Sequence, residues 1–507
     1  MGRTTGPRLS MAVLVLALLS AAALVVGCGS GEIRDRYEAE KMAWQAGKLA
    51  RAMSTNPELA TDEMRARVEE GYAAIVRRFR PPTPGETLTR QASDIASISG
   101  QSRLALAALA LDRDDPGKAL ELYRSVRDSY SFDRALSIDA YLGAGNALEI
   151  ADQWPEAVRT YEELLADWRP APSQAEAPDL RILRTPVRVA LGYTARRDAA
   201  HASEWYERAY AYYDRWISDW DGSPTAALAL DMKGEAYVQQ GRFREAADAY
   251  ELLDERYGTE DNRGALWLRL AEIYASGLGR PAKARDYYLM VTQAYAGEVA
   301  GATAEIAIAR LNIEDGEYAA ARIRLEKTLE DFKDEKAIAA TALQYLALSH
   351  ELEGAWESAL PRYNALAQEH PTTLYGLAAP LHVARHYRDA GAAEAADKAL
   401  ARAVEHYERV IHDYASSPAE LAARSHLVEA LLDQHEWGKA ADKLVETAGL
   451  FAGSEAAPGM LLQAAELYRG KLGDTAKATR TLETVRATYA GTPAAKAADD
   501  RLRSMTE

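Results

Sequence analysis

The chain has 507 residues, a formal net charge of −16, 48 % hydrophobic residues and 27 % charged residues. This composition is that of a folded protein and excludes a disordered chain, while the acidic charge disfavours binding to nucleic-acid phosphates. The length exceeds what one globular core usually holds, so several domains or one elongated array are expected.

Residues 1–27 have the pattern of a bacterial signal peptide. Arg3 and Arg8 precede the apolar run 11–26, which is shorter than the ~20 residues that a membrane-spanning helix needs. The run ends in Val-Val-Gly-Cys, which resembles the lipobox of bacterial lipoproteins. The resemblance implies cleavage before Cys28 and acylation of that residue, for example with palmitate, and residues 28–36 are then expected to be the lipidated Cys and a short tether.

Cys28 is the only cysteine, so no disulfide is possible within the chain. Two or three acyl chains would form a lasting membrane anchor, whereas one would be marginal. Gly29 follows Cys28; in the enterobacterial sorting scheme that such signals resemble, the absence of Asp there implies the periplasmic face of the outer membrane. The inner membrane and a Gram-positive cell membrane remain alternatives.

The clearest folded element is residues 230–257, which reads as two helices separated by Gly241. In the second helix, Ala246, Tyr250 and Tyr257 lie on one face, because eleven residues at about 100° each return almost to the starting direction. The same spacing, a small residue followed by two larger ones, recurs from residue 68 to the end of the chain. Its members are Val68-Tyr72-Phe79, Ala119-Tyr123-Tyr130, Ala157-Tyr161-Trp168, Ala209-Tyr213-Trp220, Ala246-Tyr250-Tyr257, Ala284-Tyr288-Tyr295, Ala321-Leu325-Phe332, Ala359-Tyr363-His370, Ala403-Tyr407-Tyr414, Ala440-Leu444-Phe451 and Ala478-Leu482-Tyr489.

This pattern resembles the tetratricopeptide repeat, in which a small residue and an aromatic in each helix allow two helices to pack closely. Most repeats are 37 or 38 residues apart rather than about 34. The longer period is similar to that of bacterial tetratricopeptide-repeat outer-membrane lipoproteins with BamD- and CpoB-like repeats. The resemblance implies an all-α fold, a superhelical solenoid of about eleven helix pairs, with no cofactor.

Departures from the regular period suggest the domain organisation. We expect a degenerate repeat and loop at 37–102 and a solenoid at 103–493. Insertions are expected as a surface loop within 80–102, including the serine-rich stretch 93–102, as a proline-rich hinge at 170–186 and as a longer second helix at 391–402. A capping helix is expected within 494–507.

Signals for catalysis are sparse. The sequence has no Gly-rich phosphate loop and no GxSxG motif. His382 and His386 lie four residues apart on one helix face, which would suit a metal, but no third ligand is close in sequence. We interpret them as a pair at a helix interface and keep a metal-dependent enzyme as the less favoured hypothesis. His370 occupies the ring position of its repeat and needs no ligand role.

The concave face of a solenoid, formed by the first helix of each pair, is the candidate binding surface. The position after the small residue of the first helix carries acidic, basic and amide side chains, which favours protein partners with basic or apolar segments. We therefore predict a lipid-anchored periplasmic scaffold that binds other envelope proteins or peptides and acts in outer-membrane assembly or maintenance, without enzymatic activity. A module that binds peptidoglycan or polysaccharide is the main alternative. The candidate residues are Asn146, Glu235, Glu272, Arg310, Arg385 and Glu429.

Overall fold

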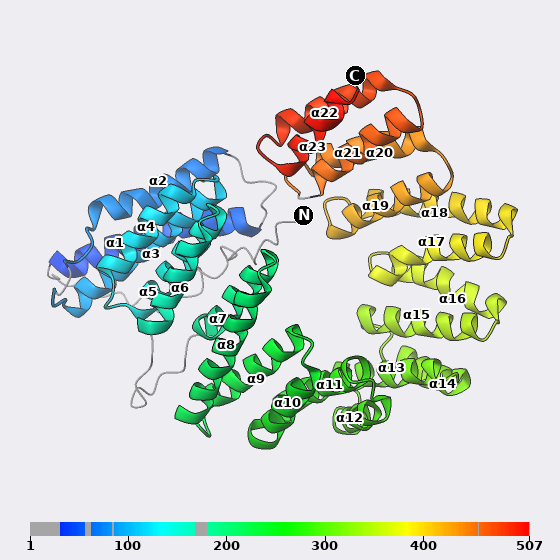
Figure 1. Cartoon of the computed structure of the whole chain (residues 1–507), viewed down its shortest axis with the longest axis horizontal. Helices are drawn as coiled ribbons and strands as arrows, with labels where there is room; N and C mark the ends of the chain where they lie inside the picture. Colours follow the sequence, from blue (N-terminus) through cyan, green and yellow to red (C-terminus); the bar gives the residue numbers. More distant parts are fainter. Residues whose placement is uncertain (1–30, 56–61, 84–85, 168–179, 455, 506–507) are drawn as a thin grey trace. The chain divides into compact units, whose positions relative to one another are not determined.

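The computed structural model describes residues 31–55, 62–83, 86–167, 180–454 and 456–505, so Cys28 and the predicted signal peptide lie outside the described residues. All regular secondary structure in these residues is helical, as Figure 1 shows. The chain divides into two compact units, Met1–Tyr257 and Gly258–Glu507. The predicted all-α fold of about eleven helix pairs is confirmed.

In each pair, the first helix is called the A helix and the second the B helix. Unit 1 contains α1 (Gly31–Thr55), α2 (Asp62–Arg78), α3 (Arg90–Asp112), α4 (Pro116–Ser129), α5 (Arg134–Ile150), α6 (Trp154–Asp167), α7 (Leu180–Ala195), α8 (Ala199–Asp219), α9 (Pro224–Gln239) and α10 (Phe243–Tyr257). Unit 2 contains α11 (Glu260–Glu272) with a π-helical turn η3 (Ile273–Gly277), α12 (Pro281–Ala294), α13 (Val299–Glu314), α14 (Tyr318–Asp331), α15 (Lys336–Leu352), α16 (Trp356–Glu369), α17 (Leu374–Asp389), α18 (Ala393–Asp413), α19 (Pro418–Asp433), α20 (Trp437–Leu450), α21 (Ala457–Gly470), α22 (Thr475–Thr488) and α23 (Pro493–Arg503).

The pair α9 and α10 illustrates how the local sequence specifies the fold. Ser223 caps α9 by accepting a hydrogen bond from the Ala226 amide at 3.3 Å, and Pro224 occupies the first helical position, where no amide donor is needed. Gly241 follows the helix with φ +70°, a conformation that favours glycine. These signals turn the chain back so that α10 packs against α9.

The repeated small residue lies in the B helix of every pair and is the contact point of that pair. The side chains at this position are 0 % exposed in all eleven pairs, from Val68 in α2 to Ala478 in α22. The third position ends the B helix: Tyr130, Tyr295 and His370 are C-cap residues, for example. The spacing in the sequence therefore reflects two requirements of each pair: close packing of its helices and termination of its B helix.

The structure corrects three expectations, one for the tether and two for the insertions. Helix α1 begins at Gly31, so most of the expected tether 28–36 is helical. Helix α3 runs through 93–102, and its serines do not form a loop: the Ser99 hydroxyl donates to the Phe79 carbonyl at 2.7 Å and the Ser102 hydroxyl to the Ile98 carbonyl at 2.8 Å. Serine is small enough for a close helix contact once its hydroxyl has an acceptor.

Pro186 does not break a helix either, because it lies inside α7 between the buried residues Leu183 and Val187. Packing there offsets the one backbone hydrogen bond that proline removes. The rest of the expected hinge, 170–179, falls outside the described residues. At the third insertion, α18 has 21 residues where most B helices have 14, and this confirms the predicted longer helix at 391–402. Helix α23 lies where the capping helix was expected.

One consequence of burial in α18 is a predicted loss of stability in mild acid. Burial and the nearby Arg409 charge lower the pKa of His406 to about 4, whereas an unfolded histidine titrates near 6.5. The unfolded chain therefore takes up a proton first, and stability present above pH 6.5 is lost as the pH falls toward 4. We expect about 1 to 2 kcal/mol to be lost between pH 7.5 and pH 5. His406→Phe should remove this component from urea unfolding curves recorded at both pH values; an unchanged pH dependence would contradict the assignment.

None of the described helices combines the length and the apolar character that crossing a membrane requires.

Candidate binding surface

The A helices of unit 2 form a continuous layer. Helix α13 contacts α11 and α15, and α17 contacts α15 and α19, in addition to the contacts of each A helix with its own B helix. The outward side chains of α11, α13, α15, α17 and α19 therefore share one surface, here called the A-face. This is the surface on which four of the six candidate residues were expected.

Those four residues form ion pairs between successive A helices. Arg310 Nη2 on α13 lies 3.2 Å from Glu272 Oε2 on α11, and Arg385 Nη2 on α17 lies 3.3 Å from Glu429 Oε2 on α19. Burial alone would favour a neutral Glu272, but hydrogen bonds from Ser276 and Tyr288 and the Arg310 charge lower the pKa of its carboxyl. The A-face of unit 2 therefore carries acidic and basic groups held in fixed positions by their neighbours.

The two candidate residues of unit 1 lie in different surroundings. Asn146 on α5 accepts a hydrogen bond from Arg188 Nη2 on α7 at 3.0 Å, and Arg188 Nε also donates to Glu149 at 3.1 Å. Asn146 is thus part of a contact between repeats. Glu235 on α9 is exposed.

The two histidines identified in the sequence bind one carboxylate. His382 Nε2 and His386 Nδ1 on α17 lie 2.8 Å from the two oxygens of Glu351, at the end of α15, and the Tyr363 hydroxyl donates to Glu351 at 2.6 Å. His386 stacks on Trp356 with ring centroids 3.4 Å apart. Burial would raise the pKa of Glu351, but the three hydrogen bonds outweigh burial and lower it. The interpretation of the histidines as a helix-interface pair agrees with these contacts.

Among the described residues, three carboxylates are each bound by a tyrosine of their own repeat and by a basic side chain of the next repeat. Glu149 meets Tyr161 and Arg188, Glu272 meets Tyr288 and Arg310, and Glu351 meets Tyr363 and the two histidines. Sequence reasoning missed Glu149 and Glu351. Each lies twelve residues before the tyrosine of its B helix. Each also lies three residues after the A-helix position at which the candidate residues were sought, so a search for acidic residues at this spacing could have identified them.

The same geometry leaves little support for a metal centre on α17. His382 and His386 face a single carboxylate, Glu351, and each is hydrogen-bonded to one of its oxygens. Within the part of the chain that the structure describes, no group of three or more His, Cys, Asp or Glu side chains is arranged to hold a metal ion.

The contribution of this cluster can be measured with Glu351→Gln. The folded pKa of Glu351 lies below the unfolded value of about 4.3, so its contribution is present above that pH and is lost as the pH falls through the folded pKa. We expect the variant to lower the free energy of unfolding by about 1 to 2 kcal/mol at pH 7 and by less below pH 4. Glu357→Gln, on the exposed side of α16, is the matched control and should change little. Equal losses for the two variants would contradict a special role for Glu351.

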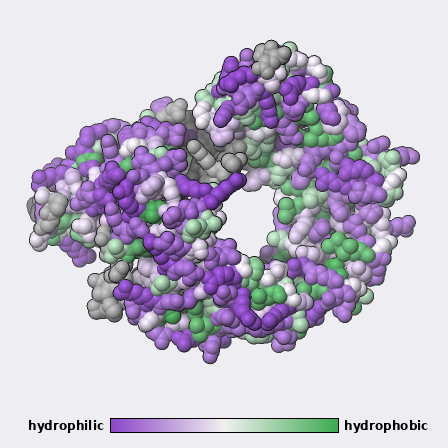
Figure 2. All heavy atoms as spheres, viewed as in Figure 1, coloured by the Kyte–Doolittle hydropathy of each residue, from purple (hydrophilic) through white to green (hydrophobic). Residues whose placement is uncertain are grey.

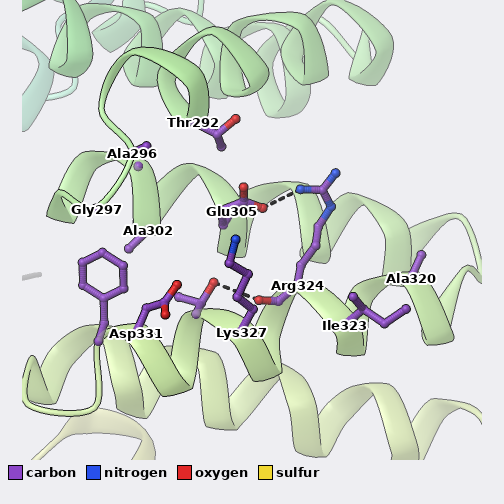
Figure 3. Close-up of a pocket in the computed structure, with 13 residues that line it drawn as sticks. Thr292, Ala296, Gly297, Ala302, Glu305, Ala320, Ile323, Arg324, Lys327 and Asp331 are labelled. Carbon is purple, nitrogen blue, oxygen red and sulfur yellow. Dashed lines mark hydrogen bonds and ion pairs between the residues drawn. The ribbon is translucent and has the colours of Figure 1, made fainter.

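A shallow recess of about 490 Å³ lies between α12, α13 and α14. Figure 3 shows Glu305 and Arg324, which form an ion pair, pointing toward each other across it, with Ile323 at one end and Ala302 at the other. The Ile323 side chain is 70 % exposed. The recess is large enough for one or two side chains of a partner. The surface visible in Figure 2 is mostly hydrophilic, with scattered hydrophobic patches.

Comparison with known proteins identifies no family. No family model matches the chain, and no curated protein sequence matches it. Among solved structures, yeast Tom70 is 12 % identical over 93 % of this chain and 96 % of its own, with a TM-score of 0.38. A tetratricopeptide repeat protein from Parabacteroides merdae is 18 % identical over 56 % of this chain and 98 % of its own, with a TM-score of 0.31. The apo quorum sensor NprR from B. thuringiensis is 14 % identical over 73 % and 99 %, with a TM-score of 0.35.

Proposed function

We propose that the protein is a lipid-anchored scaffold on the periplasmic face of a bacterial outer membrane, which binds other envelope proteins or peptides in assembly or maintenance of that membrane. The observation that carries the proposal is the A-face, a continuous surface whose charged side chains are held by ion pairs between repeats. Side chains that are already fixed lose little conformational entropy when a partner binds. The surface contains both signs of charge, which suits an irregular protein surface better than a uniformly charged ligand.

The membrane anchor rests on the sequence around Cys28. The apolar run, the following Val-Val-Gly-Cys and the absence of any other cysteine support acylation at that position. In bacteria fed with labelled palmitate, the wild-type protein should acquire label and Cys28→Ala should not. Ser30→Ala, two residues further on, is the control and should be labelled like the wild type. Label in Cys28→Ala, or none in the wild type, would refute the anchor.

Binding of protein partners can be tested on the A-face directly. A photo-crosslinking amino acid in place of Glu429, which is exposed on α19, should capture envelope proteins in the native host. The same substitution at Lys439, which is exposed on the B helix α20, is the matched control and should capture fewer. Equal capture at the two positions, or capture of nothing, would count against the A-face as the binding surface.

The alternative ligand is peptidoglycan or polysaccharide. Aromatic rings that stack on sugars are the usual basis of glycan binding, but the A-face residues described above are mainly charged. We expect the purified protein to be washed from isolated sacculi by moderate salt. Retention on sacculi that is lost when A-face residues such as Arg385 are changed to alanine would favour the glycan-binding alternative.

A further inference from the structure

Helix α1 places its small residues inward and its large ones outward. Its buried face consists of Ala39, Ala43, Ala46 and Ala50, each at most 7 % exposed, together with Met53. On the opposite side, Ile33 is 51 % exposed, Tyr37 63 % and Trp44 56 %. A helix that only had to pack on its neighbours would bury these large side chains, because each would contribute more to stability than an alanine.

The three exposed residues form one stripe. At about 100° per residue, Ile33, Tyr37 and Trp44 lie within about 40° of one another around the helix axis and extend along about 16 Å of its length. Single exposed apolar residues are normal on protein surfaces, but an aligned set marks a surface that contacts something else.

A row of basic residues runs beside the stripe. Arg34, Lys41 and Lys48 follow at intervals of seven residues and are all exposed, and Lys48 Nζ lies 5.4 Å from the centre of the Trp44 ring. Among the described residues, no ion pair involves these three side chains.

In contrast, each acidic residue of α1 forms an ion pair or a hydrogen bond with another side chain. Glu40 pairs with Arg36 at 2.9 Å, Asp35 and Glu38 lie 3.9 and 3.5 Å from Arg78 on α2, and Glu32 accepts a hydrogen bond from Thr89 at 3.1 Å. Glu40 lies only about 20° from Ile33 around the helix axis, so the outward side also carries the Glu40–Arg36 pair, whose two charges cancel. The remaining charges on that side are the three basic residues, in a chain whose formal net charge is −16.

We propose that this side of α1, formed by Ile33, Arg34, Tyr37, Lys41, Trp44 and Lys48, lies on an anionic lipid bilayer with the helix axis in the membrane plane. Trp and Tyr combine an apolar ring with a polar atom and favour the headgroup region, while Lys and Arg beside them are attracted to anionic lipids. The inference rests in part on the proposed function, since α1 begins three residues after the cysteine proposed to be acylated. Three residues span about 10 Å at most, so an anchor at Cys28 would hold α1 beside the bilayer surface.

The contact would add a second membrane signal to the lipid anchor. An acyl chain fixes only the distance of the N-terminus from the bilayer, whereas a helix lying on the surface also fixes the orientation of whatever packs on it. Helices α2 and α3 both contact α1. They would be oriented with it.

The test measures membrane binding by α1 in the absence of the lipid anchor. It uses the chain from Cys28 to Glu507, produced in the cytoplasm without the signal peptide, so that Cys28 is not acylated. This chain keeps every described element, because the first begins at Gly31. It should sediment with vesicles of phosphatidylcholine and phosphatidylglycerol in equal parts and about tenfold less with phosphatidylcholine alone. Tyr37→Ser with Trp44→Ser, and separately Lys41→Glu with Lys48→Glu, should each weaken binding to the anionic vesicles about tenfold. High salt should weaken it as well.

The matched control changes two apolar residues that are equally exposed but lie in unit 2. Leu374→Ser with Leu450→Ser, at 75 % and 60 % exposure, should leave vesicle binding unchanged. The proposal would be overturned if the wild-type protein did not bind anionic vesicles, or if the α1 variants bound them as well as the wild type does. It would also be overturned if the control variant lost as much vesicle binding as the α1 variants. Dimerisation without lipid that disappears in the Tyr37 and Trp44 variant would instead assign the stripe to a second copy of the chain. None of these outcomes affects the palmitate-labelling test of the anchor.

Discussion

Tyr363→Ala is expected to lower the free energy of unfolding of unit 2 by about 4 kcal/mol, because it removes a side chain that is 1 % exposed at the contact between α15, α16 and α17. The ring lies 4.6 Å from that of His382 and 5.9 Å from that of Trp356, and its hydroxyl donates to Glu351. The loss should appear in urea unfolding and as faster amide hydrogen exchange in all three helices.

Two control variants separate packing from the hydrogen bond. Tyr363→Phe removes only the hydroxyl and leaves Glu351 its two histidine partners, so it should cost about 1 kcal/mol. Tyr414 occupies the ring position at the end of α18 and is 39 % exposed. Tyr414→Ala should therefore lower the free energy of unfolding by about 3 kcal/mol less than Tyr363→Ala does. If Tyr363→Phe costs as much as Tyr363→Ala, the polar cluster rather than the ring holds these helices together.

The positions of the helix pairs could be predicted because one packing requirement recurs at each of them. An alanine such as Ala359 is needed where the B helix touches its A helix, and a ring such as His370 is placed where the B helix ends. Both requirements act within about 40 residues and use the same residue types each time, so a single sequence shows them as a period.

The contacts between repeats could not be read in the same way. The sequence shows His382 and His386 on one face, but their partner Glu351 lies 31 and 35 residues earlier, and only the offset between α15 and α17 brings them together. Arg188 and Glu149 are 39 residues apart and meet for the same reason. Such pairs depend on how far each repeat is rotated against the next, which the repeated residues do not encode.

The error at 93–102 has a different cause. The serine-rich stretch suggested a loop because serine side chains compete with the backbone for hydrogen bonds. In α3 these hydroxyls have partners that are compatible with the helix: Ser97 donates to Asp133 at 2.7 Å, Ser99 to the Phe79 carbonyl, and Ser102 to the Ile98 carbonyl of its own helix. The local preference is therefore overridden by contacts with other helices and by hydrogen bonds within α3. A composition-based expectation fails wherever such tertiary partners are present.

Gly376→Ala is expected to destabilise unit 2 by about 3 kcal/mol, because no space exists for a methyl group at this position. Gly376 is the third residue of α17, and an added Cβ would collide with the His370 carbonyl oxygen, with its carbon at 2.7 Å and with the Leu366 oxygen at 2.9 Å. These are backbone atoms that cannot move aside independently. The Leu366 carbonyl accepts from the His370 amide at 3.1 Å, and the His370 carbonyl accepts from the Thr373 amide at 3.0 Å, so any shift would disrupt both the end of α16 and the cap of α17.

Gly459 provides the matched control because it is also the third residue of an A helix, α21, and has no atom within 4 Å of an added Cβ. Gly459→Ala should therefore raise stability by about 0.5 to 1 kcal/mol, since alanine loses less backbone entropy than glycine when a helix forms. Urea unfolding of both variants gives the comparison. Opposite signs would establish that Gly376 is required by the close approach of α16 to the start of α17. Higher stability in both variants would mean that α17 can move away from α16 without a loss of free energy. The close packing of successive repeats at Gly376 would then not determine the stability of unit 2.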